Sequence, residues 1–131
     1  MKRKGLFYVS FAVVLLAIIG VLVGRPQSEE PAREIVLIAK EMSFIVQSGL
    51  ESEERNPTLR LEPGESIKIV FHNQDPGIYH DLRIESLGIQ TGPLAYGESE
   101  QFIFQVPKQT GDDQYACSIH GLVMNGRIVI R

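Results

Sequence analysis

The sequence predicts an all-β domain, a sandwich or barrel of short strands, preceded by one apolar segment. Short apolar runs recur along the second part of the chain, and none of them is long enough for an ordinary helix. β-branched and aromatic residues dominate these runs, and turn residues fill the gaps between them. A chain of 131 residues has room for one compact domain and an appendage.

The expected strands follow one another from Glu34 to the C-terminus. Their ranges are residues 34–40, 58–62, 66–73, 79–86, 101–106, 114–118 and 126–131. Glycine, proline and aspartate punctuate the gaps, at residues 63–64, 75–77, 92–93 and 111–112. Regularly spaced short strands are typical of a sandwich or barrel.

Side chains that alternate along the strands predict which faces are buried. In residues 66–73, one face carries Ile67, Ile69 and Phe71, and the other carries Lys68, Val70 and His72. Two further pairs of apolar residues share a face and provide facing layers for a core, Phe102 with Phe104 and Ile128 with Ile130. Residues 47–56 are acidic and unpatterned, so we expect a solvated loop or a single helical turn there.

Residues 6–23 form an apolar segment without a charge. As a helix it would span about 27 Å, against a hydrocarbon core of about 30 Å. Lys2, Arg3 and Lys4 precede it, and the positive-inside rule keeps such residues in the cytoplasm. We therefore expect residues 1–24 to be a single-pass transmembrane anchor that places the C-terminal domain on the extracytoplasmic side of the cell membrane.

A cleaved signal peptide is the alternative for this segment. The apolar region of a signal peptide usually covers about 7 to 15 residues and leads to small residues at the cleavage site, whereas Leu22 and Gly24 make a poor site. No cysteine directly follows the segment, which excludes a bacterial lipid anchor. Residues 25–33 are polar and contain two prolines, so we expect an extended linker there and a folded domain over residues 34–131.

The charge of the chain is divided unevenly. All 16 acidic residues follow the apolar segment, and three of the 13 basic residues precede it, which leaves 10 basic residues and a net charge of −6 in the remainder. This balance argues against nucleic acid as a partner, because phosphate binding requires a basic surface. A partner with a basic face is expected instead.

The residues between the last two expected strands carry the chemistry. Cys117, His120 and Met124 fall within one short loop, and Cys117 is the single cysteine of the chain. A lone exported thiol is a liability unless something occupies it. Soft sulfur ligands combined with imidazole favour copper, and one Cys, two His and a weak axial Met define the blue-copper arrangement.

A second histidine is needed to complete such a site. His72 falls on the polar face of its expected strand and is expected to point to solvent. His80 follows the turn at residues 75–77, where a loop can deliver it beside the last hairpin. The candidate ligands of one copper ion per chain are therefore His80, Cys117, His120 and Met124, with a glutamine or a backbone carbonyl as the alternative to the Met.

From about Ile35 to Arg131 the chain resembles the cupredoxins of the plastocyanin and azurin kind. In that family Asn-x-Asp precedes the first histidine ligand, as residues 73–75 precede His80, and a Tyr-x-Cys-x-x-His run with Met-x-Gly closes the site. The matching positions here are Tyr115, Cys117, His120, Met124 and Gly126. The resemblance implies a Greek-key β-sandwich with a mononuclear type 1 copper at one end.

Asp81 is a departure from the family pattern. The residue after the first histidine is often an asparagine that ties the two ligand loops together, and an aspartate can accept such a hydrogen bond but cannot donate one. The binuclear copper centre of related oxidase subunits is excluded, because it needs two bridging cysteines and this chain has one.

The expected function is single-electron transfer between redox partner proteins of the cytochrome or oxidase type. Two alternatives are an extracytoplasmic copper carrier and an accessory module of a membrane oxidase complex. Neither an enzyme activity nor a small-molecule substrate is expected, because a buried and fully ligated copper leaves no open position for substrate. The resemblance implies that His120 and the apolar residues of its loop form a docking patch.

Overall fold

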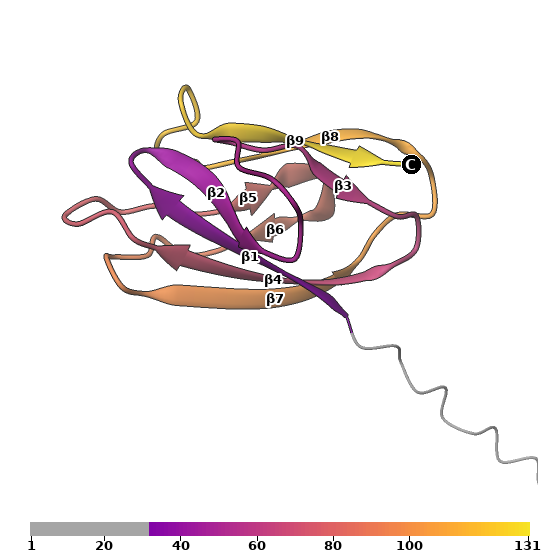
Figure 1. The fold of residues 1–131 in the computed structure, drawn as a ribbon, viewed down its shortest axis with the longest axis horizontal. Helices are drawn as coiled ribbons and strands as arrows, with labels where there is room; N and C mark the ends of the chain where they lie inside the picture. Colours follow the sequence, from indigo (N-terminus) through magenta and orange to yellow (C-terminus); the bar gives the residue numbers. More distant parts are fainter. Residues whose placement is uncertain (1–31) are drawn as a thin grey trace, which may run out of the picture.

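The computed structural model describes residues 32–131, which form two packed β-sheets (Figure 1). The predicted anchor and most of the predicted linker lie outside the described residues. Among residues 32–131, no helix is long and apolar enough to cross a membrane. The two sheets confirm the predicted all-β class.

The first sheet has four strands. In the order in which they lie side by side, these are β2 (Ser43–Ser48), β1 (Arg33–Lys40), β4 (Ser66–Asn73) and β7 (Ser99–Gln105). β1 and β4 are parallel, whereas β1 with β2 and β4 with β7 are antiparallel. The predicted alternation in β4 is confirmed, because its isoleucines and Phe71 are buried and the residues between them are partly exposed.

The second sheet has five strands and carries the residues of the predicted metal loop. Its order is β3 (Leu59–Leu61), β9 (Asn125–Ile130), β8 (Gly111–Ala116), β5 (Arg83–Ile84) and β6 (Ile89–Gln90), with a short 3₁₀ turn, η1 (Glu85–Leu87), between β5 and β6. β3 and β9 are parallel, and the other neighbours are antiparallel. The chain passes repeatedly between the two sheets, as in Greek-key sandwiches.

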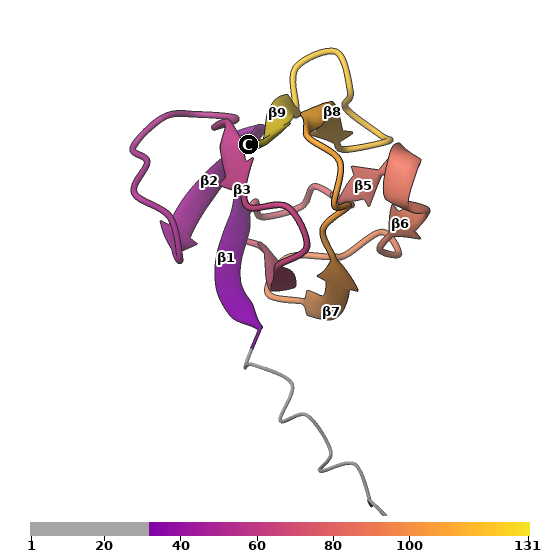
Figure 2. The same ribbon diagram turned by 90° about the vertical axis from the view of Figure 1, so that its right-hand side faces the viewer.

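The two sheets face each other (Figure 2), and both contribute large side chains to the core between them. Phe44 packs against Phe71 and against Tyr115, with ring centroids 5.8 and 5.1 Å apart. The Tyr115 hydroxyl donates a hydrogen bond of 2.6 Å to the Pro57 carbonyl oxygen, which satisfies the polar end of a side chain that is otherwise fully buried. These contacts hold the two sheets together next to the loop that follows β8.

Strand β2 is not among the strands expected from the sequence. Its residues pair with β1 across a two-residue turn at Glu41 and Met42, which have φ values of 50° and 56°. Such turns normally use Asn and Gly, because both central residues need positive φ. The residue types of this turn therefore do not predict a turn, and for that reason the strand that follows it was not expected.

The segment of residues 79–86 is also less regular than expected. Only Arg83–Ile84 belong to β5, and His80 forms an isolated bridge with Leu94. The expected loop at residues 47–56 is confirmed from Gly49 onward, while its first two residues complete β2.

Candidate metal centre

The predicted ligands come from two segments at the same end of the sandwich (Figure 1). Cys117 follows directly after β8, and His120 lies in the loop that leads to β9. His80 lies in the connection between β4 and β5, held in place by two backbone hydrogen bonds with Leu94 of 3.2 and 2.8 Å. The fold thus brings together residues that are 37 positions apart.

Three donor atoms converge at this end. The Cys117 Sγ lies 3.9 Å from the Nδ1 of His80 and 3.6 Å from the Nδ1 of His120, and the three ligand atoms lie within 4.8 Å of one another. Three ligands at metal bonds of about 2.0–2.3 Å in a trigonal plane stand about 3.5–4 Å apart. The spacing therefore fits one metal ion bound by all three side chains.

The loop between β8 and β9 is closed by its own backbone. The Cys117 amide donates to the Met124 carbonyl at 3.0 Å, and the amides of Val123 and Met124 both donate to the His120 carbonyl at 2.9 Å. Asn56 adds a side-chain hydrogen bond to the Val123 carbonyl at 2.9 Å. These hydrogen bonds stabilise the conformation of the loop that carries His120.

Met124 is fully buried and belongs to the same apolar cluster as Cys117. The backbone hydrogen bond between these two residues places the start and the end of the loop side by side. The Met124 thioether is therefore enclosed by the core at the end of the sandwich where Cys117 lies. The assignment of Met124 as a metal ligand stays a prediction.

His80 and His120 differ in their surroundings. Their rings meet edge to face, with centroids 4.9 Å apart at 61°. His80 is completely buried, whereas His120 is half-buried.

His72 lies in β4 opposite Ser99 and does not join the cluster of His80, Cys117 and His120. The sequence-based separation of His72 from the other two histidines agrees with this placement.

Asp75 approaches His80 from the side opposite Cys117. Its Oδ2 lies 2.8 Å from the His80 Nε2, and its two oxygens also accept hydrogen bonds from the amides of Glu41 and Met42, at 2.5 and 2.9 Å. Burial alone would raise the pKa of Asp75, but the hydrogen bonds from the two amides and from His80 outweigh it and hold the pKa below its usual value. The carboxylate is therefore ionised at neutral pH.

Asp81 ties the two ligand segments together. Its carboxylate accepts hydrogen bonds from the Ser118 amide, at 2.6 Å, and from the Ser118 hydroxyl. Ser118 follows Cys117 and Asp81 follows His80, so the contact joins the neighbours of two candidate ligands. An acceptor is what this geometry requires, and the aspartate supplies it despite its departure from the family pattern.

Burial raises the pKa of the Cys117 thiol above its usual value. Backbone amides of Asp81, His120 and Ile119 favour the thiolate, but they do not cancel the cost of burying it. In the absence of a metal the sulfur therefore keeps its proton at neutral pH. A metal ion that binds there must displace that proton.

Sequence reasoning missed one residue that builds the site, Asn73, and left the role of Asp75 open between two alternatives. Asn73 donates to the carbonyls of Ile78 and Leu94, at 2.6 and 2.7 Å, and accepts from the Asp75 amide at 2.8 Å. Asn73 was expected only as part of the Asn-x-Asp pattern. Asp75 was expected either to serve a turn or to form a hydrogen bond next to the ligands, and its contact with His80 agrees with the second role. A signal for Asn73 was present, because this polar residue ends a strand of alternating apolar residues shortly before a candidate ligand.

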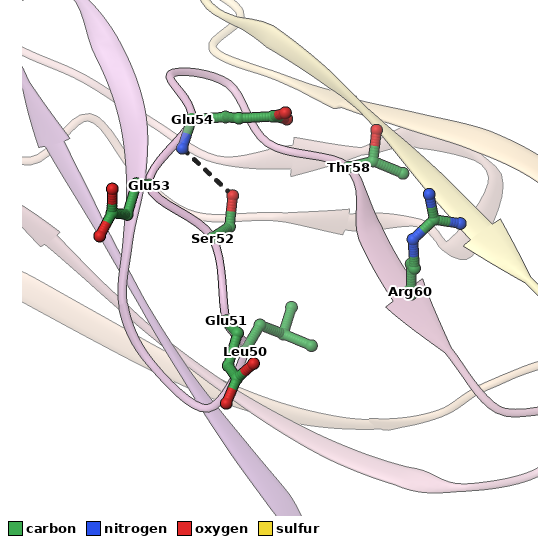
Figure 3. Close-up of a pocket in the computed structure, with 7 residues that line it drawn as sticks. All are labelled: Leu50, Glu51, Ser52, Glu53, Glu54, Thr58 and Arg60. Atoms are coloured by element: carbon green, nitrogen blue, oxygen red, sulfur yellow. Dashed lines mark hydrogen bonds between the residues drawn. The ribbon is translucent and has the colours of Figure 1, made fainter.

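A separate hollow of about 430 Å³ lies at the loop between β2 and β3 and at β3 itself (Figure 3), and no histidine lines it. Its walls include several carboxylates and one guanidinium group, and its lining residues are Leu50, Glu51, Ser52, Glu53, Glu54, Thr58 and Arg60. The Glu54 amide donates to the Ser52 hydroxyl within it, at 3.3 Å. This agrees with the expectation of a solvated acidic loop.

Comparison with known proteins gives a result for structure alone. No model of a known protein family matches the sequence, and no curated protein sequence matches it. Among solved structures, rusticyanin from Thiobacillus ferrooxidans aligns with a TM-score of 0.60 and 21% identity, over 75% of this chain and 76% of that chain. A structure of rusticyanin variants gives 0.58 and 24%, over the same shares.

A chain of a heme-copper terminal oxidase dimer is also similar. It aligns with a TM-score of 0.58 and 15% identity, over 75% of this chain and 63% of that chain. At identities this low, the structural similarity shows the fold alone. That fold is the one of rusticyanin, a cupredoxin. The two imidazoles and the thiol come from this chain's own geometry, and this donor set is typical of copper. The described domain therefore has the cupredoxin fold, and its cluster of His80, Cys117 and His120 fits one type 1 copper site.

Proposed function

We propose that this chain is a membrane-anchored electron carrier with one type 1 copper ion, which His80, Cys117, His120 and Met124 would hold. The observation that carries the proposal is the convergence of one sulfur and two ring nitrogens within 4.8 Å at a closed end of the sandwich. Bound copper supplies a one-electron couple between Cu(I) and Cu(II). The chain itself acts as a carrier and not as an enzyme.

The protein's contribution is a rigid and dry ligand set. Cys117 and His80 are completely buried, and the backbone bonds of the β8–β9 loop hold His120 and Met124 in fixed positions. Ligands that cannot rearrange favour a similar geometry for both oxidation states, which keeps the reorganisation that accompanies electron transfer small. Burial also leaves no open position for a substrate.

The test is visible absorption and electron paramagnetic resonance of the purified full chain loaded with Cu(II). An intense blue or green thiolate band together with a narrow copper hyperfine splitting is the expected result. A weak and pale spectrum would remove the type 1 site and favour copper carriage in its place.

We expect copper affinity to depend on pH through Cys117. Because the raised pKa keeps the thiol protonated, binding releases a proton, and the apparent affinity should rise about tenfold per pH unit between pH 7 and 8. Competition with a chelator at a series of pH values measures this slope. The Cys117→Ser variant is the control and should show a shallower slope, whereas equal slopes would contradict the expectation.

The apolar surface beside His120 is proposed as the docking patch for a redox partner. Leu122 is fully exposed, and Ile119 and Val123 are about half exposed. Apolar side chains gathered around a half-buried ligand mark a place where a partner can approach the metal while water is excluded. The acidic remainder of the chain favours a partner with a basic face.

The variant Leu122→Glu should slow electron exchange with a c-type cytochrome on the order of tenfold, because a charge must then be desolvated at the contact. Stopped-flow rates measured at high salt keep long-range charge effects small. The matched control is Ile103→Glu, which adds the same charge at an exposed apolar residue of β7 in the other sheet. Equal rates for the two variants would rule out the patch.

A second candidate function is an accessory module of a membrane oxidase complex. The structural similarity to a chain of a heme-copper terminal oxidase favours it, and the predicted anchor at residues 6–23 would place the domain beside such a complex. Purification of the full chain from its native membrane distinguishes the two functions. Stoichiometric haem in the preparation supports the module, and its absence supports the independent carrier.

A further inference from the structure

Asp75 makes more contacts than a turn residue needs. It takes part in four hydrogen-bonding contacts. Its carboxylate contacts the His80 ring nitrogen and accepts hydrogen bonds from two backbone amides, and its own amide donates to the Asn73 side chain. The carboxylate is nearly inaccessible, with 6% relative exposure for the residue. A buried carboxylate costs free energy unless it is paired in this way, so the arrangement is specific.

The contact with His80 determines which nitrogen of the ring faces the thiol. The Nε2 is 2.8 Å from Asp75, and the Nδ1 is 3.9 Å from the Cys117 sulfur. A neutral imidazole binds a metal through its unprotonated nitrogen and carries its proton on the other one. A carboxylate on Nε2 therefore keeps the proton there and leaves the lone pair of Nδ1 directed at the metal site.

The same carboxylate stabilises the turn between β1 and β2. Glu41 and Met42 both have positive φ, a conformation that costs free energy for any residue other than glycine. Both amides of the turn point at Asp75 and are satisfied by it. The first hairpin is thereby connected to the metal site through a single side chain.

We propose that Asp75 is a positioning residue for the metal site, which fixes the ring and the tautomer of His80 and keeps a negative charge behind it. The inference rests on the proposed copper site, and Asp75 itself does not touch the metal. The fixed charge favours the more positive oxidation state, Cu(II), and so lowers the reduction potential. The contact also makes the position of the ligand depend on the β1–β2 hairpin.

The variant Asp75→Asn keeps the size of the side chain and removes the charge and one acceptor. One of the three donors that now meet the carboxylate must lose its partner. We expect copper affinity to fall about 10- to 100-fold, as for other residues that orient a metal ligand. The reduction potential should rise, and the copper hyperfine splitting should change.

A second variant separates positioning from simple support of the turn. Glu41→Asn with Met42→Gly gives the turn the residues that adopt positive φ most readily, so the hairpin needs less help from Asp75. Combined with Asp75→Asn, this pair should restore thermal stability while copper affinity stays low and the potential stays high. Recovery of both copper properties in the triple variant would show that Asp75 acts only through the turn and would overturn the proposal, as would an unchanged affinity and potential in Asp75→Asn.

The experiment also separates this inference from the function it rests on. In the metal-free full chain, ¹⁵N chemical shifts of the His80 ring report the tautomer directly, and we expect the proton on Nε2 in the wild type. A proton on Nδ1 would refute the role of Asp75, whatever the copper spectrum shows. A wild-type chain with the Nε2 tautomer but no thiolate band would instead contradict the copper site itself.

Discussion

Replacement of Cys117 by serine should abolish the intense visible band of the copper-loaded protein, the largest spectroscopic change expected for any single substitution. The band depends on a thiolate bound to Cu(II), and Cys117 is the single cysteine of the chain. A serine hydroxyl is a harder and weaker ligand that is not ionised at neutral pH. Absorption and electron paramagnetic resonance of the purified variant measure the loss.

The side chains of the two histidines remain in Cys117→Ser, so residual copper should give a pale spectrum with a wide hyperfine splitting. His72→Ala is the matched control, because this histidine lies outside the cluster of His80, Cys117 and His120. It should leave the blue or green band unchanged. A band that survives in Cys117→Ser, or one that disappears in His72→Ala, would show that the metal lies elsewhere.

The variant Gly126→Ala is expected to destabilise the fold by about 3 kcal/mol, at the upper end of the usual range for overpacking. A Cβ at Gly126 would lie 2.4 Å from the Cζ and the hydroxyl oxygen of Tyr115, its partner across β8 and β9. The ring cannot move away easily, because its hydroxyl donates a hydrogen bond to the Pro57 carbonyl and the ring packs at a steep angle against Phe44. Thermal unfolding of the metal-free chain should show a loss in Tm on the order of 10 °C or more.

Gly111→Ala is the control for this effect. Gly111 pairs with Ile130 in the same two strands, and a Cβ there would meet no heavy atom within 4 Å. Since alanine restricts the unfolded chain, this variant should be neutral or slightly stabilising. Equal Tm values for the two variants would show that the Tyr115 ring relaxes freely, contrary to the packing described.

Local signals predicted the parts of this protein in which neighbouring residues determine the outcome. Alternation in β4 identified its buried face, and the spacing of Cys117 and His120 identified the loop that the structure closes with its own hydrogen bonds. The hairpin that contains β2 was missed for the opposite reason. Its turn is stabilised by Asp75, more than 30 residues away, and not by the types of the residues that form it.

By itself, the sequence determined the all-β class, the ligand loop that begins at Cys117 and the choice of His80 over His72 as a candidate ligand. Hydrophobic periodicity and short ligand spacings act over a few residues, so they can be recognised without a structure. Only the tertiary structure decided how the ligands are held. The pairing of Asp75 with His80 and of Asp81 with Ser118 joins segments that meet only after the sheets pack. Such contacts depend on the direction of each side chain in the folded sandwich, which no local pattern of residues specifies.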